Sequence, residues 1–154
     1  MDPINTLGYL FHHTSTIMYR QSDQILQERL GIGMSQFKLL MMLQNRPGVQ
    51  QKVLAECLGQ TEASISRQIK LLLEKGMLAV KINAENRREH LTVPTAKGVK
   101  IGEAAKDILA EHNKPAFEQL SDKQRDQLTA MLRTIHAHYC QPDKPYACDK
   151  PFDI

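Results

Sequence analysis

Apolar residues recur at helical spacing over most of the chain, beginning near its start. The first apolar stripe consists of Leu7, Leu10, Phe11, Ile17, Met18 and Ile25. Gly31 and Gly33 follow it and should end this helix. A second helix is expected over "QFKLLMMLQN", with Ser35 as its N-cap and the helix-breaking "RPG" after it.

Two further helical segments follow, and after them the sequence has the composition of β-strands. The segment "QQKVLAECL" ends at Gly59, and "TEASISRQIKLLLEKG" should begin at an N-cap, Thr61, and stop at Gly76. The runs "MLAVKI" and "EHLTV" have the composition of strands. The polar stretch between them places the adjacent Arg87 and Arg88 at the tip of an expected hairpin.

The remainder is helical again, apart from the tail. Thr95 should cap a long helix that is broken near Pro115. Its apolar face is Ile101, Ala104, Ala105, Ile108 and Leu109. Ser121 and Gln124 have the spacing of a capping box for a last helix. Its apolar stripe is Leu128, Met131, Leu132, Ile135 and Tyr139. The tail, 141–154, holds three prolines and no helical period, so it should be a loop or an arm.

This order of elements predicts a mainly α, α+β winged-helix fold. Two helices joined by "GQ" fit a helix–turn–helix, whose second helix enters the major groove of DNA. In that helix Ile65, Ile69 and Leu72 share one face and should pack inward. The candidate DNA-binding residues are Thr61, Ser64, Ser66, Arg67, Gln68 and Lys70 on the helix, with Arg87 and Arg88 on the wing. A solvated amphipathic helix would show the same split, but the hairpin directly after it favours a DNA-reading wing.

The charge distribution agrees with this interpretation. The chain carries a formal net charge of +3, and residues 62–100 hold eight basic and four acidic side chains, so the rest sums to −1. A basic excess around the wing is typical of a nucleic-acid interface, although a solvated basic face looks alike. An arginine at the wing tip suits the negative potential of a narrowed minor groove, and two adjacent arginines on extended backbone would face opposite sides.

Other functional classes lack their usual signals. The start "MDPINTLGYLF" has no basic region or long apolar run, so neither a secretory signal nor a membrane span is expected. Three cysteines, Cys57, Cys140 and Cys148, without a C-x-x-C motif suggest reduced thiols and a cytoplasmic protein. No phosphate-binding loop, carboxylate pair or Ser/His/Asp arrangement stands out, so neither an enzyme nor a cofactor is expected.

The stretch "LAECLGQTEASISRQIKLLLEKGMLAV" resembles the MarR family of bacterial winged-helix regulators. The resemblance extends from about Leu7 to Tyr139. Family wings read Asp-x-Arg, five residues, then Leu-Thr-x-x-Gly; in that register Arg88 is the minor-groove arginine and Thr95 starts the next helix. Asn86 replaces the family aspartate that braces the wing, and Pro94 replaces the leucine that ends the second strand.

The resemblance also implies a homodimer. Residues 1–34 and 95–140 would be the dimerisation helices, 35–94 the winged helix–turn–helix lobe, and 141–154 a tail. Independently of it, the apolar stripes on the terminal helices exceed what one small lobe can cover. A dimer would bind a pseudo-palindromic operator on double-stranded DNA. The chain is therefore expected to be a transcriptional regulator, most often a repressor in this family.

Family members respond to small aromatic or phenolic effectors, to oxidants or to zinc. Phe11, Phe37, Met41 and Met42 are the candidate effector pocket, although they could equally be plain core. The tail cysteines could sense oxidants, and His136 with Cys140 could share a zinc-ligand face, but the family's clustered Glu and His ligands are missing. The competing hypothesis is a winged-helix protein-interaction module that does not bind specific DNA.

Overall fold

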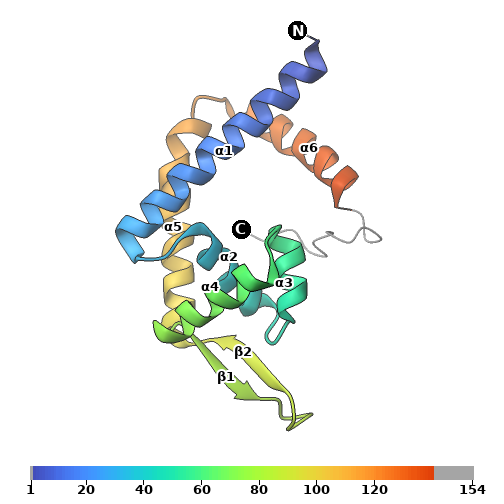
Figure 1. Cartoon of the computed structure of the whole chain (residues 1–154). Coiled ribbons are helices and arrows are strands. Elements are labelled where there is room, and N and C mark those ends of the chain that lie inside the picture. The colour runs from blue at the N-terminus through green and yellow to red at the C-terminus, as the bar shows by residue number, and fades with distance from the viewer. Residues whose placement is uncertain (1, 141–154) are drawn as a thin grey trace.

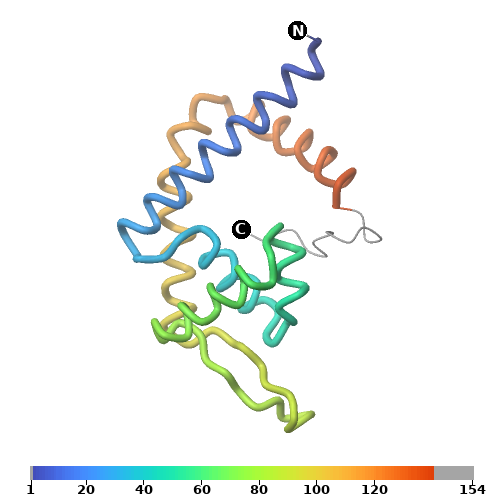
Figure 2. The backbone as a smooth tube through the Cα atoms, viewed as in Figure 1, coloured from blue at the N-terminus to red at the C-terminus, as the bar shows by residue number. Residues whose placement is uncertain are grey.

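The computed structural model describes residues 2–140. The predictions for the tail, including that for Cys148, lie outside these residues. Three helices form an arch over a smaller lobe, and a hairpin projects from the far side of that lobe (Figures 1 and 2). The predicted mainly α winged-helix fold is thereby confirmed.

The arch consists of α1 (Pro3–Leu30), α5 (Ala96–Phe117) and α6 (Asp122–Tyr139). α1 packs against α5, whereas α6 diverges from α5 and holds no fully buried residue (Figure 1). α6 begins at the predicted capping box: Ser121 Oγ accepts from Gln124 N, and Gln124 Oε1 accepts from Ser121 N at 2.8 Å.

The lobe holds the remaining elements: α2 (Met34–Asn45), α3 (Gln51–Leu58), α4 (Glu62–Glu74), β1 (Leu78–Ile82) and β2 (His90–Pro94). The two strands form an antiparallel sheet in which Leu78 pairs with Pro94 and Ile82 with His90. Pro94 ends the second strand, where its missing N–H costs the ladder least.

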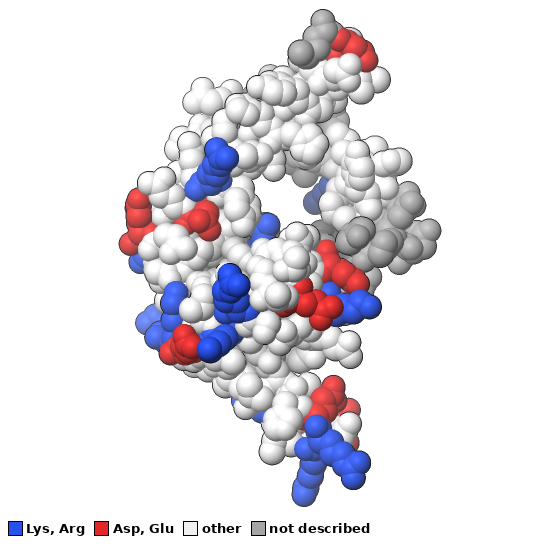
Figure 3. Space-filling view, viewed as in Figure 1, with Lys and Arg blue, Asp and Glu red and all other residues white. Residues whose placement is uncertain are grey.

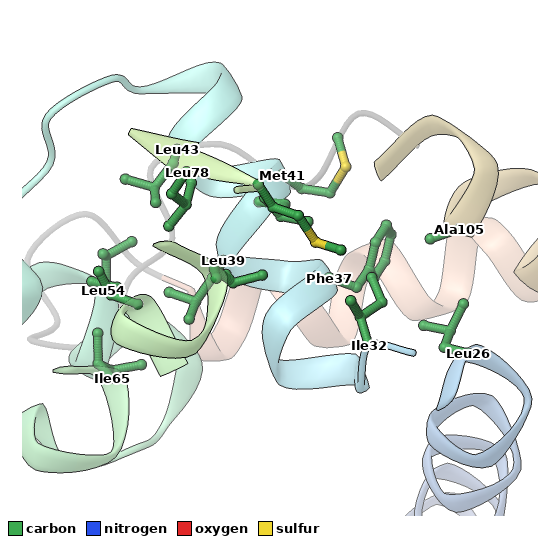
Figure 4. Packing of buried hydrophobic residues seen from close by; sticks show 14 of the residues in the cluster. Leu26, Ile32, Phe37, Leu39, Met41, Leu43, Leu54, Ile65, Leu78 and Ala105 are labelled. Carbon is green, nitrogen blue, oxygen red and sulfur yellow. The ribbon is translucent and has the colours of Figure 1, made fainter. Parts of the chain in front are cut away.

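The core joins the lobe to the arch. Leu39, Leu43, Leu54 and Ile65 are fully buried between α2, α3 and α4 (Figure 4), and Leu72 belongs to the same cluster. Leu26 of α1 and Ala105 of α5 belong to the same buried cluster. The lobe and the arch therefore do not have separate cores, because both contribute side chains to one packed cluster.

A close junction fixes where the wing leaves the lobe. Thr95, the predicted N-cap of α5, donates from Oγ1 to Gly76 O at 2.7 Å and from N to Met77 O at 3.0 Å. Gly76 has a φ of +69°, a backbone conformation that is strained for any residue with a side chain. Gly98 packs so closely on the Met77 carbonyl that a Cβ at that position would collide with backbone. The end of α4, the start of β1 and the start of α5 thus meet at one closely packed corner.

Two local predictions were wrong. Ser35 does not cap α2, which begins one residue earlier; Asp23 of α1 accepts from Met34 N at 2.7 Å and takes the cap's place. Pro115 does not break α5, which continues to Phe117, because a proline in the last turn removes only one intrahelical hydrogen bond.

The apolar stripes of the arch are largely uncovered in the single chain. On α1 the exposed large apolar residues are Ile4, Leu7, Tyr9, Leu10, Phe11, Ile17 and Tyr19. On α6 they are Met131, Leu132, Ile135 and Tyr139. Exposed apolar area on this scale marks an interaction surface. In the described part of the chain, no helix has both the length and the apolarity that a membrane span requires.

Candidate nucleic-acid interface

The turn between α3 and α4 sets the direction of α4. Gly59 ends α3 in the left-handed conformation, and Gln60 N donates to Ala55 O at 2.9 Å. Thr61 then caps α4 as predicted, since its hydroxyl accepts from Ser64 N at 3.1 Å. Thr61 and Glu62 are exposed, so the capped N-terminal end of α4 lies at the surface of the lobe.

α4 divides into a packed and an open face. Ile65, Ile69 and Leu72 are buried, as their spacing predicted. Of the candidate DNA-binding residues on this helix, Thr61, Ser66, Arg67 and Lys70 are exposed, and Ser64 and Gln68 are half-buried. The half-buried pair lies at the margin between the two faces, where a side chain can contact both the protein and a ligand.

Both marginal side chains are held by contacts that the sequence did not predict. Ser64 Oγ hydrogen-bonds Gln60 Oε1 at 3.1 Å, and Gln60 Nε2 donates to Ser35 Oγ at 2.8 Å. Gln36 Nε2 donates to Gln68 Oε1 at 3.0 Å. Ser35 and Gln36 lie on α2, so α2 orients the polar edge of α4. No local signal predicts these contacts, because the partners of Ser35 and Gln36 are 25 and 32 residues away.

The wing arginines lie on a turn and not on extended backbone, so the expected alternation of their faces was wrong. Arg87 and Arg88 are the central residues of a turn closed by a hydrogen bond from Glu89 N to Asn86 O at 2.9 Å. Asn86 Oδ1 also accepts from Arg88 N at 3.2 Å. Asparagine therefore makes here the side-chain-to-backbone turn that an aspartate could also make.

The base of this turn is tied by a second asparagine. Asn83 N donates to Glu89 O at 2.9 Å, and Asn83 Nδ2 donates to Glu89 Oε2 at 2.7 Å. Within residues 2–140, Glu89 forms no ion pair with Arg87 or Arg88. Basic side chains gather at the far end of the wing (Figure 3). Two exposed guanidinium groups thus stand on a braced tip, and neither forms an ion pair within the described residues.

The candidate effector residues are divided by the structure. Phe37 and Met41 are buried in the core, and Met42 packs against it. Phe11 is exposed on α1 and belongs to the uncovered stripe instead. In the single chain the first three residues support packing, and Phe11 would meet them only through a rearrangement or a second chain.

Tyr19, at the contact between α1 and α2, has a shifted pKa. Burial raises the pKa of Tyr19, and the neighbouring charge of Asp23 raises this pKa further. The ammonium group of Lys38 lies 5.0 Å from the centre of the Tyr19 ring. The phenol is neutral at physiological pH even with its ordinary pKa, and the raised pKa moves its ionisation further from that range.

The thiol and histidine candidates remain apart from this interface. Among the described residues, Cys57 and Cys140 are half-buried and form no disulfide bond. His136 and Cys140 are joined by a backbone hydrogen bond of 2.8 Å. Among the described residues, no three His, Cys, Asp or Glu side chains gather as a metal site would require.

Comparison with known proteins agrees with this geometry. Residues 30–89 match the family model described as "MarR family". The HTH-type transcriptional regulator BilQ of Clostridium symbiosum is 24% identical over 122 residues, which cover 77% of this chain and 83% of BilQ. The S. aureus MepR–DNA complex matches with a TM-score of 0.67 and 25% identity, over 86% of this chain and 95% of MepR. The Mycobacterium tuberculosis MarR family protein Rv2887 in complex with p-aminosalicylic acid has a TM-score of 0.71 and 20% identity, over 84% and 97% of the two chains.

Proposed function

We propose that this chain, whose residues 30–89 match the MarR family model, belongs to that family, binds a pseudo-palindromic operator as a homodimer and represses transcription until a small effector releases it. It would act in the bacterial cytoplasm, on the nucleoid. The observation that carries the proposal is the exposed polar face of α4 beside a wing that presents two unpaired arginines. α4 would enter the major groove, and the arginines at the wing tip would enter the adjacent minor groove, so each lobe could contact both grooves of one half-site.

The homodimer is supported by the uncovered apolar stripes of α1 and α6. A two-fold dimer built on these helices would cover both stripes and present two α4 helices to the same side of DNA. Half-sites would then lie about 34–36 Å apart, one helical turn. Of the relatives, MepR is known in complex with DNA, which supports DNA as the partner here.

Effector release is supported by the shared core of arch and lobe. Because Leu26 and Ala105 pack with the lobe residues, a ligand at the arch–lobe boundary would shift the separation of the two lobes. Rv2887 in complex with p-aminosalicylic acid suggests a small aromatic acid as the ligand class. Phe11, Phe37, Met41 and Met42 remain the proposed contacts.

The test is selection of bound fragments from randomised duplex DNA with reduced protein at two salt concentrations. An enriched pseudo-palindrome is the expected result. Weak binding without enrichment, lost at the higher salt, would instead favour a protein-interaction module, since only non-specific phosphate contacts would remain.

Replacing Arg88 with alanine should weaken binding to all sequences and relax any A·T preference beside each half-site. The guanidinium would no longer neutralise negative potential in the minor groove, so the slope of log K against log salt should fall by about one unit. Titrations at several salt concentrations measure this slope. The control is Arg133→Ala, which removes the same charge from exposed α6. Equal slopes for the wild type and Arg88→Ala would contradict the wing assignment.

Replacing Arg67 with alanine should change which DNA sequence the protein prefers, and not lower its affinity for all sequences equally. A bidentate contact to guanine contributes on the order of 1–3 kcal/mol of discrimination, so the loss should be confined to one base position of each half-site. Affinities for a panel of single-base operator variants measure it, with Lys70→Ala as the charge-matched control on the same helix. A uniform loss over the whole panel would show that Arg67 contacts phosphate.

A further inference from the structure

We infer that Gln36, a buried residue of α2, fixes the hydrogen-bond polarity of Gln68 on α4 and so determines which class of base Gln68 contacts. The inference rests on the proposed DNA binding by α4. Gln36 is 7% exposed and is one of the two buried polar residues in the described part of the chain. It occupies the point where the end of α1, the end of α4 and the polar face of α4 meet.

Lys75 sets the orientation of the Gln36 amide. Lys75 Nζ donates to Gly31 O at 2.6 Å and to Gln36 Oε1 at 3.5 Å. An ammonium group has donors and no acceptor, so only the oxygen of the Gln36 amide can face it. The amide nitrogen of Gln36 must then point the other way.

This orientation is passed on to Gln68. Gln36 Nε2 donates to Gln68 Oε1 at 3.0 Å, so the oxygen of Gln68 is turned toward α2. Reversing the Gln68 amide alone would set two N–H groups against each other beside a buried side chain. An unsatisfied buried donor of this kind disfavours the reversed state by about 5- to 100-fold.

Gln68 therefore presents donors outward. Among residues 2–140, its Nε2 group forms no hydrogen bond, and the side chain is half-buried at the edge of the open face. A bidentate contact to adenine needs both Oε1 and Nε2 on the base edge. With its oxygen held by Gln36, Gln68 instead favours guanine, which accepts at both O6 and N7, or thymine, which accepts at O4, over adenine, which accepts only at N7, or cytosine, whose N4 amino group donates.

The test is Gln36→Glu, which changes polarity without changing side-chain length. The new carboxylate has no donor and still pairs with Lys75, so the Gln68 amide should reverse, with Nε2 toward α2 and Oε1 outward. Fragment selection and operator titrations should then show one position per half-site changing from guanine or thymine to adenine or cytosine. The expected change in the preference ratio is about 5- to 100-fold. Thermal unfolding and affinity at the other positions report whether the variant folds.

A Gln68→Ala background identifies the route of the effect. In that background Gln36→Glu should leave the base preference unchanged, because no amide remains to be reversed. If the wild type selects an operator and Gln36→Glu selects the identical bases, the inference is overturned while the proposed function stands. A preference that changes equally in the Gln68→Ala background would also overturn it. If the wild type selects no operator, the proposed function itself fails.

Discussion

Replacing Leu7 and Ile135 together with glutamate is expected to convert the protein to monomers and to abolish specific DNA binding. The two side chains are 61% and 39% exposed in the single chain, one on each stripe of the arch. In the proposed dimer each would be buried, and burial of such a side chain contributes about 1.5–3 kcal/mol. A symmetric dimer contains four substituted positions, so the dissociation constant of the dimer should rise more than about 1,000-fold.

Analytical ultracentrifugation over a range of concentrations measures the dimer, and titration with a selected operator measures the loss of affinity. The control is Asn5→Glu with Ala137→Glu, which adds the same charges on the opposite sides of the same helices. The control should remain dimeric. A Leu7→Glu/Ile135→Glu variant that sediments as a dimer would show that the two stripes are not the interface.

The helices and their ends were predictable because the signals that fix them are local. Thr61, Thr95 and Ser121 cap the helices that their spacing predicted, and each contact spans three residues. The start of α2 was not predictable in this way. Its cap is Asp23, which lies 11 residues earlier on another helix, and only the folded chain brings the two together. A local candidate, Ser35, was available and instead bonds Gln60.

In the candidate site, too, the features fixed by local sequence were predictable and those that depend on tertiary packing were not. The open face of α4 follows from its apolar period, and the wing tip follows from two strand-like runs around a polar stretch. The turn at Asn86 was less accessible, because an asparagine can serve either an extended strand end or a side-chain turn. The Gln36–Gln68 contact could not be predicted at all, since it requires the packing distance between α2 and α4.

Replacing Leu72 with alanine is expected to lower the free energy of unfolding by about 2–5 kcal/mol. Leu72 is 0% exposed and lies on the inner face of α4, in the cluster that joins the helix to the rest of the lobe. The substitution removes buried apolar area and leaves a cavity that close-packed neighbours fill only in part. Urea denaturation measures the change, at two protein concentrations because a dimer's stability depends on concentration.

Leu71 provides a matched control, because it is the adjacent residue, has the same side chain and is 37% exposed. Leu71→Ala should cost less than about 1 kcal/mol, since its contacts are partly replaced by water in the native state. The two variants also separate stability from recognition. At a temperature where both remain folded, Leu72→Ala should lower operator affinity more, because α4 then loses the packing that holds its reading face in position. Equal unfolding free energies for the two variants would place α4 on the lobe with a different face inward.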